Sequence, residues 1–200
     1  MSGYNFSKMQ KKLKKELDEP RYVHTLGVMY TAMSLAMCHG EDLERTGVAG
    51  LLHDCAKCIP NPQKIKLSEH YKIPISSVEC SAPQLLHAKL GACIAKDKYG
   101  VEDTEILSAI RCHTTGKPAM SLMEKIVFIS DYIEPGRVKA PNLTRIRTLA
   151  FSDLDMAVYL TLRDTLSYLE QTKASLDNQS IVAYNYYENL ISNRRFCYPE

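Results

Sequence analysis

The sequence lacks any hydrophobic run that could span a membrane, because no apolar stretch approaches the roughly 18 residues that a spanning helix requires. Its lysine-rich beginning, residues 1–18, lacks the apolar core of a secretory signal. A strong charge of either sign is also missing, since the formal net charge is only +2. We therefore expect no nucleic-acid partner and no membrane partner.

A disulfide framework is absent as well. The seven cysteines are an odd number at irregular spacings, which favours a cytoplasmic protein in a reducing compartment. Cys55 and Cys58 have C-x-x-C spacing, but no second pair follows and no strand–helix pattern surrounds them. We interpret them as two buried thiols, not as a redox or zinc motif.

What the sequence contains is a succession of helical patterns without a sustained strand-like alternation. With 200 residues, 45% of them hydrophobic and 24% charged, it fits one domain with a full core. Capping residues, apolar spacing and breaks predict helices at 6–17, 20–38, 43–57, 63–70, 82–99, 105–113, 122–134, 154–170 and 179–194. The expected caps are Asp42, Asp103 or Thr104, Ser121 in a capping box with Glu124, and Asp153. The prediction is an all-α, single-domain helical bundle over 1–200. A basic helix lies within 1–18, and a helix within 175–200 packs on the bundle.

The most informative stretch is His53-Asp54, which stands in an otherwise apolar run. Burying an ionised carboxylate is costly unless it is paired or binds a metal. Neutral imidazole and carboxylate are ligands of divalent transition metals. Lys57 follows Asp54 by three residues and His53 by four, so we expect its ammonium over the same helix face. The pair predicts a metal site.

Other predicted helices offer further ligands. The first set provides two imidazoles and two carboxylates from three helices: His24, His53, Asp54 and Asp131. Helical bundles build metal sites from facing helices in this way. His87 and His113 come from two more helices and could hold a second metal, with Asp54 as the bridge. Singly, each histidine is more simply structural, so the prediction depends on the whole set.

The order H…HD…D resembles the HD-domain superfamily of metal-dependent phosphohydrolases, which are all-helical. More narrowly, the sequence is similar to the YqeK-type family of symmetrical bis(5′-nucleosyl)-tetraphosphatases, which act on diadenosine tetraphosphate. The matching stretches fall within about 21–155: RYVHTLGV at 21–28, AGLLHD at 49–54 with Lys57, LH at 86–87, HTTG at 113–116 and SDYIEPGR at 130–137. Ser130 replaces a usual alanine, and 173–180 matches the family's substrate-facing stretch poorly.

The resemblance implies an HD-type hydrolase domain over 1–200 that binds one or two iron ions. Its metal ligands would be His24, His53, Asp54 and Asp131. His87 and His113 would then contact substrate phosphates, hold a second metal, or do both. Nitrogen and oxygen ligands without thiolate are also compatible with manganese, nickel or zinc. The expected reaction is in-line attack of an activated water on phosphorus, which releases two ADP molecules.

For catalysis we assign Asp54, Lys57 and Asp131, the two carboxylates to orient the water or take its proton. Lys57 is alternatively a solvated cation at a helix end. The substrate-binding residues are predicted to be His24, His87, His113, Thr114 and Arg137. The planar fork of Arg137 matches phosphate oxygens, although the side chain could pair with Glu134 instead. Glu134 itself is expected to orient a metal ligand.

Other functions fit the same residues. One is a different HD-type nucleotide phosphohydrolase or phosphodiesterase, and another is a non-catalytic nucleotide sensor that keeps the metal for its shape. The lysines of 6–17 are the only argument for nucleic-acid binding, and a solvated helix face explains them better. A homodimer is also compatible with the sequence, because the tyrosines of the last helix are either core residues or dimer contacts: Tyr184, Tyr186 and Tyr187.

Overall fold

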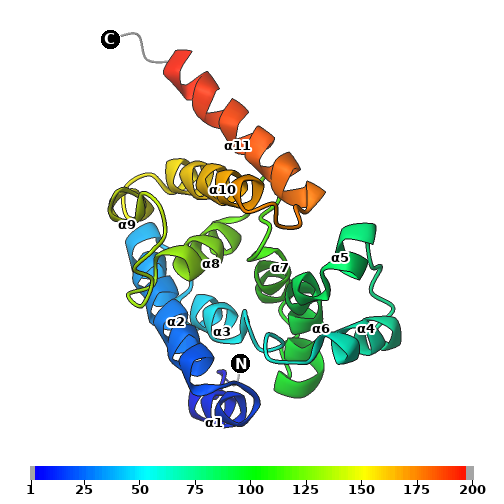
Figure 1. Ribbon diagram of the computed structural model, residues 1–200. Coiled ribbons are helices and arrows are strands. Elements are labelled where there is room, and N and C mark those ends of the chain that lie inside the picture. Colours follow the sequence, from blue (N-terminus) through cyan, green and yellow to red (C-terminus); the bar gives the residue numbers. More distant parts are fainter. Residues whose placement is uncertain (1–2, 197–200) are drawn as a thin grey trace.

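Helices make up all the regular structure of the described residues, as the sequence predicts. The computed structural model describes residues 3–196, apart from the side chains of 195 and 196 (Figure 1). Residues 1–2 and 197–200, which belong to the predicted terminal segments, lie outside the described residues. In chain order the elements are α1 (Phe6–Glu16), α2 (Glu19–His39), α3 (Leu43–Leu52), α4 (Asn61–His70), α5 (Ser77–Ser81), η1 (Pro83–Leu86), α6 (His87–Tyr99), α7 (Thr104–Cys112), α8 (Leu122–Ile133), α9 (Leu143–Ala150), α10 (Leu154–Gln171) and α11 (Asn178–Phe196).

Local capping chemistry sets where the main helices begin. A side-chain oxygen before the helix accepts a backbone N–H of the first turn, which would otherwise have no partner. The side chain that accepts and the backbone amide that donates are, in turn, Asp18 and the Arg21 amide, Asp42 and the Arg45 amide, Asp103 and the Ile106 amide, Ser121 and the Glu124 amide, and Asp153 and the Met156 amide. At Ser121 the Glu124 side chain also accepts the Ser121 amide, which completes the predicted capping box.

The helix predicted for 43–57 is too long. α3 ends at Leu52, and residues 53–58 form turns. The His53 ring supplies the reason, because its Nδ1 lies 2.7 Å from the Gly50 carbonyl oxygen. In a continuing helix that oxygen would accept the amide of residue 54. The turns leave Cys58 exposed, so the prediction of two buried thiols holds for Cys55 alone.

Two further boundaries differ from the prediction. The helix expected at 82–99 is divided into η1 and α6, and a separate helix, α5, precedes it. Ala82 separates α5 from η1, and its backbone is not helical (φ −132°, ψ 68°) because a following proline disfavours the helical region. α9 was not predicted. It is short, its N-cap Asn142 makes no side-chain capping bond, and it buries only Ile146 and Ala150.

Two helices hold the bundle together, α2 and α8. Met29 and Val127 belong to a core cluster shared with α1, α3, α6 and α7, whereas Leu35 and Ile129 belong to a second cluster with α9, α10 and α11. Gly50 allows α3 to approach α2 closely, since a Cβ there would lie 3.1 Å from the Met29 Cα. Figure 1 shows α2, α3, α7 and α8 converging on the middle of the bundle.

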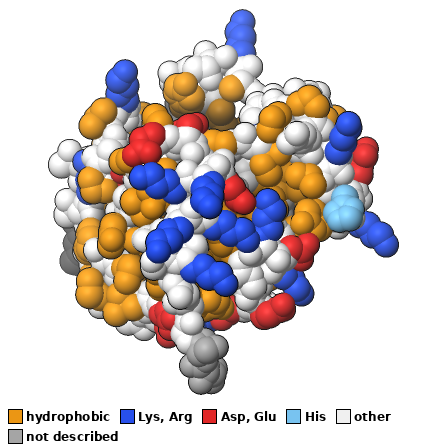
Figure 2. Space-filling view, turned by 90° about the horizontal axis from the view of Figure 1, so that it is seen from below, with side chains coloured by type: hydrophobic (Ala, Val, Ile, Leu, Met, Phe, Trp, Pro, Cys, Tyr) orange, Lys and Arg blue, Asp and Glu red, His pale blue; other side chains and the backbone are white. Residues whose placement is uncertain are grey.

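The ends of the chain pack in different ways. α11 lies against α10 (Figure 1), and the buried Tyr187 accepts a hydrogen bond from the Met120 amide at 3.1 Å, while Tyr186 is exposed. The predicted tyrosine face is therefore partly core. On α1, Lys12 lies over the Tyr99 ring at 4.8 Å, and other lysines face solvent. Figure 2 shows lysine and arginine side chains gathered on the lower face of the molecule. Among the helices of residues 3–196, none has the length and apolarity needed to cross a membrane.

Candidate metal centre

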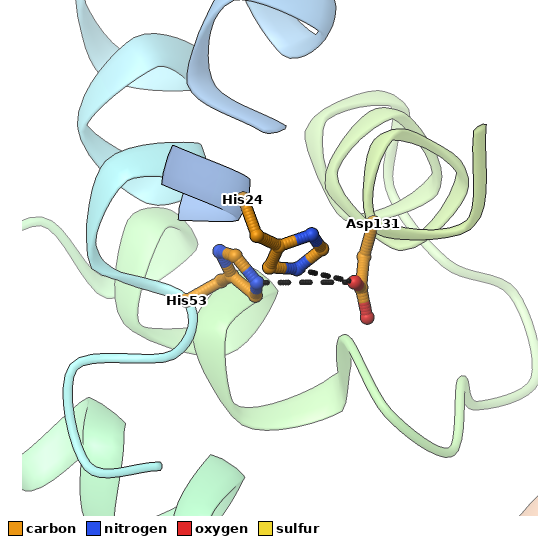
Figure 3. Close-up of side chains that lie close together, drawn as sticks. All are labelled: His24, His53 and Asp131. Carbon is orange, nitrogen blue, oxygen red and sulfur yellow. Dashed lines mark ion pairs between the residues drawn. The ribbon is translucent and has the colours of Figure 1, made fainter. Parts of the chain in front are cut away.

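Three predicted ligands from three distant segments meet in the middle of the bundle (Figure 3). His24 comes from α2, His53 from the end of α3 and Asp131 from α8. Asp131 Oδ1 lies 3.0 Å from His24 Nε2 and 3.9 Å from His53 Nε2. These ligand atoms all lie within 4.8 Å of one another, so a single ion could contact all three.

All the candidate histidine ligands except His24 have rings that are oriented by backbone carbonyl oxygens. In each ring Nδ1 lies 2.7 Å from the carbonyl oxygen three residues earlier: His53 from Gly50, His87 from Gln84, and His113 from Ile110. A carbonyl oxygen only accepts, so Nδ1 carries the proton, and in the neutral ring Nε2 presents a lone pair. All three Nε2 atoms lie close to Asp54.

Asp54 has the geometry of a bridging carboxylate. Its Oδ2 is 3.5 Å from His53 Nε2, which faces the group formed with His24 and Asp131. Its Oδ1 is 3.2 Å from His87 Nε2 and 3.5 Å from His113 Nε2. The side chain is only 2% exposed. One carboxylate thus faces two adjacent ligand groups, which is the arrangement that a pair of metal ions needs.

The buried polar atoms of this cluster fit a cation. His24 Nε2, His53 Nε2 and Asp54 Oδ1 are buried and make no hydrogen bond of acceptable geometry. His87 Nε2 and His113 Nε2 are 3.2 Å apart, where two rings with the proton on Nδ1 would bring their lone pairs together. Buried polar atoms in native proteins almost always have partners. A divalent metal satisfies this set, because nitrogen and carboxylate oxygen atoms are its preferred donors.

The protonation states also suit metal ligands. Burial by itself would raise the pKa of the Asp54 carboxyl, but the imidazoles of His53, His113 and His87 hold it well below its usual range. The pKa of Asp131 is lowered in the same way, since His24 and His53 outweigh burial. Burial lowers the pKa of His87 to about 4, against the opposing effect of Asp54. Ionised carboxylates and a neutral imidazole are the forms that bind metals.

Glu134, which the sequence predicts to orient a metal ligand without indicating which one, lies behind His24. Its Oε1 is 3.1 Å from His24 Nδ1, and Oε2 accepts the Gly136 amide at 2.5 Å. The side chain is buried and closely confined, because a Cβ at Gly27 would lie 2.7 Å from Oε2. A carboxylate in this position fixes the orientation of the imidazole and increases its basicity.

Lys57 and Thr114, two of the predicted site residues, lie beside His87. Lys57 Nζ lies 3.1 Å from His87 Nε2 and 3.7 Å from Asp54 Oδ1. The Lys57 ammonium reaches this position from a turn and not from the predicted helix face. Thr114 Oγ1 lies 3.2 Å from His87 Nε2 and 3.1 Å from His113 Nε2.

Arg137 lies on the other side and pairs with Asp131. Its Nη2 is 2.8 Å from Asp131 Oδ1, and its Nε donates to the Asp131 carbonyl oxygen at 3.0 Å. Among the described contacts, its only bond to Glu134 runs from the Arg137 amide to the Glu134 carbonyl oxygen. The alternative side-chain pair with Glu134 does not form.

Sequence reasoning assigned no role to Arg21, whose Nη1 lies 2.8 Å from Asp54 Oδ2. The available signal was its place in the matched RYVHTLGV stretch, one turn before His24. Arg21 and Arg137 line an open cavity of about 530 Å³ beside the cluster, together with His24 and Glu134. Thr114 lines a second cavity of about 360 Å³. Thr114 is the one predicted site residue among those that line this second cavity.

Comparison with known proteins identifies the type of domain. A family model described as the HD domain matches residues 21–136. The chain is 36% identical over 174 residues to a symmetrical bis(5′-nucleosyl)-tetraphosphatase of Bacillus subtilis, covering 87% of this chain and 92% of the relative. It is 37% identical over 181 residues to a protein of the same name from Halalkalibacterium halodurans, covering 90% and 96%.

A solved structure agrees with these sequence matches. The crystal structure of a predicted HD superfamily hydrolase involved in NAD metabolism, from Clostridium acetobutylicum, superposes with a TM-score of 0.89. The two chains are 37% identical, and the match covers 94% of this chain and 99% of the other. The likeness thus extends over nearly the whole fold, beyond residues 21–136 that the family model matches.

Proposed function

This chain belongs to the HD domain family, and from that premise we propose that it is a metal-dependent hydrolase that cleaves diadenosine tetraphosphate symmetrically into two ADP molecules. The observation that carries the proposal is the double ligand group around Asp54. Its two carboxylate oxygens face separate sets of imidazoles, at 3.5 Å on one side and 3.2 Å on the other. The names of the relatives supply the substrate class.

We propose iron as the bound metal, in one or two ions, while manganese, nickel or zinc also suit the ligands. The first ion would be held by His24, His53, Asp54 and Asp131. When bound, the metal polarises a phosphoryl oxygen and lowers the pKa of water from 15.7 to about 7. His87 and His113 would hold a second ion or contact the phosphates, and their Nε2 atoms already face Asp54 Oδ1.

The remaining roles follow from position. Asp131 is only partly buried and would orient the attacking water or take its proton. Lys57 and Arg137 would stabilise negative charge on the leaving ADP, since both are partly exposed beside the ligands. Thr114 would donate its hydroxyl to a phosphate oxygen. The cavity of about 530 Å³ beside His24 would receive one nucleoside end, and the cavity of about 360 Å³ lined by Thr114 would receive the other.

Product analysis tests the proposal. Metal-free protein reloaded with Fe²⁺ or Mn²⁺ should convert diadenosine tetraphosphate into ADP alone. AMP and ATP as products would mean asymmetric cleavage and would contradict the proposal. Hydrolysis of cyclic or mononucleotides in place of the dinucleotide would indicate another HD-type hydrolase. Tight nucleotide binding without turnover under every metal would indicate a sensor.

A further inference from the structure

Each of the two aspartates among the predicted metal ligands forms an ion pair with one arginine. Arg21 Nη1 is 2.8 Å from Asp54 Oδ2, and Arg137 Nη2 is 2.8 Å from Asp131 Oδ1. The first arginine comes from the first turn of α2 and the second from the turn after α8. Both line the cavity of about 530 Å³, and their side chains are 28% and 43% exposed. The guanidinium groups therefore lie between the ligands and the opening.

The arginines bind the oxygens that face the first metal position. Asp54 Oδ2 is also the oxygen 3.5 Å from His53 Nε2, and Asp131 Oδ1 is the oxygen 3.0 Å from His24 Nε2. A cation bound by these imidazoles would interact with the same carboxylate oxygen atoms as the guanidinium groups do. A bound metal would therefore compete with the arginines for the two carboxylates and would weaken both ion pairs.

Arginines released in this way would remain at the opening, because their backbones are fixed. The Arg21 amide donates to Asp18 Oδ1 at 2.8 Å. The Arg137 amide donates to the Glu134 carbonyl oxygen at 2.9 Å, and the Arg137 carbonyl oxygen accepts from Arg147 Nη2 at 2.9 Å. Only the side chains need to turn, and both are already partly in solvent.

We propose that Arg21 is a phosphate-binding residue that acts with Arg137, and that metal binding releases both guanidinium groups from the ligand carboxylates to the polyphosphate chain. The inference rests on the proposed function, since a chain of phosphates is the ligand that two planar guanidinium forks at one cavity fit. Neutralising Asp54 is not a sufficient role for Arg21. The Lys57 ammonium, 3.7 Å from Asp54 Oδ1, already supplies a positive charge there, and a bound metal would supply more.

The test uses the full chain loaded with Mn²⁺ and the variants Arg21→Gln and Arg21→Lys. Arg21→Gln should raise the KM for diadenosine tetraphosphate by roughly tenfold to a hundredfold with little change in kcat, the effect of one lost charge-assisted bond. It should weaken binding of inorganic tripolyphosphate by a similar factor. Its affinity for Mn²⁺ alone should be unchanged or higher, because a competing cation is gone. Arg21→Lys keeps the charge without the fork and should recover part of the KM.

The matched control is Arg45→Gln. Arg45 is also partly exposed and bonded to an aspartate, Asp103, at 2.7 Å, but away from the cluster. The KM of Arg45→Gln for diadenosine tetraphosphate should stay at the wild-type value. An unchanged KM in Arg21→Gln overturns the inference. So does a joint loss of Mn²⁺ affinity and kcat, which would make Arg21 a positioning residue for Asp54. Absence of turnover by the wild-type protein would instead refute the proposed function.

Discussion

Replacing Gly27 by alanine should weaken metal binding, although alanine is the better helix former. Gly27 lies in α2 beside the end of α8, and an added Cβ would fall 2.7 Å from Glu134 Oε2. Carbon and oxygen atoms do not approach so closely, and Glu134 must shift. The carboxylate that would shift is the one that lies 3.1 Å from His24 Nδ1. The substitution therefore disturbs a ligand without touching it.

The expected size follows from two opposing effects on stability. Alanine in a helix interior is favoured over glycine by about 1 kcal/mol. Displacing Glu134 weakens its charge-assisted bonds to His24 Nδ1 and to the Gly136 amide, each of which contributes about 1.5–3 kcal/mol. The loss is larger, so the free energy of unfolding should fall by about 1–3 kcal/mol. Metal affinity should fall by roughly tenfold to a hundredfold, as when a ligating histidine loses its partner.

Calorimetric titration of metal-free protein with Mn²⁺ measures the affinity, and urea unfolding measures the stability. Gly47→Ala is the matched control, since its added Cβ meets the flexible Met33 side chain at 3.1 Å and nothing of the cluster. It should leave Mn²⁺ affinity unchanged. Glu134→Gln keeps an acceptor oxygen for His24 Nδ1 and should lose less affinity than Gly27→Ala. Wild-type Mn²⁺ affinity in Gly27→Ala would refute the view that Glu134 orients His24.

Three further predictions follow from the same contacts. Asp54→Ala removes the bridging carboxylate and should abolish metal content, measured by plasma emission, together with turnover; normal turnover would exclude the proposed centre. Thr114→Val removes only the hydroxyl and should lower kcat/KM by roughly tenfold while bound metal is retained. The Arg45 side chain holds the pKa of Asp103 below its usual range. This ion pair therefore stabilises the fold fully above about pH 3.9, the pKa of Asp in the unfolded chain. The stabilisation is lost as the pH falls through the lower pKa of Asp103 in the folded state. The difference in unfolding free energy between wild type and Asp103→Asn should therefore shrink below about pH 4, and it should be modest because the pair is partly exposed.

Features that depend on a few neighbouring residues could be predicted from the sequence. The caps at Asp42, Asp103, Ser121 and Asp153 form as expected, because an N-cap bond joins atoms only two or three residues apart. The ligand candidates could also be chosen, since a carboxylate buried in an apolar helix is costly unless a metal or an opposite charge compensates it. The resemblance to HD-domain hydrolases, now supported by the family match, sharpened that choice.

What could not be predicted depends on contacts between distant segments or on competition for a single atom. The end of α3 is set by one ring nitrogen that takes the Gly50 carbonyl oxygen, and helical spacing contains no sign of it. The contact between Arg21 and Asp54 joins α2 to the turn after α3, two segments that the sequence does not place relative to each other. Arg137 pairs with Asp131 and not with Glu134 for a similar reason, because His24 and the Gly136 amide already occupy the Glu134 carboxylate.

The position of each histidine in its helix explains why only one of the four needs an acidic partner. His53 is the C-cap of α3, His87 the C-cap of η1 and His113 the C-cap of α7. The last carbonyl oxygens of a helix have no intrahelical partner, so the rings of His53 and His113 each use one to fix Nδ1. The Gln84 carbonyl oxygen accepts both the backbone amide and the ring of His87. His24 lies inside α2, where the carbonyl oxygens accept backbone amides, and its Nδ1 must find a side chain. That side chain is Glu134, held where Pro135 ends α8 and where Gly27 leaves it room. The bonds that orient His53 and His113 therefore use carbonyl oxygens at the ends of α3 and α7, so the orientation of these ligands is set by the fold itself.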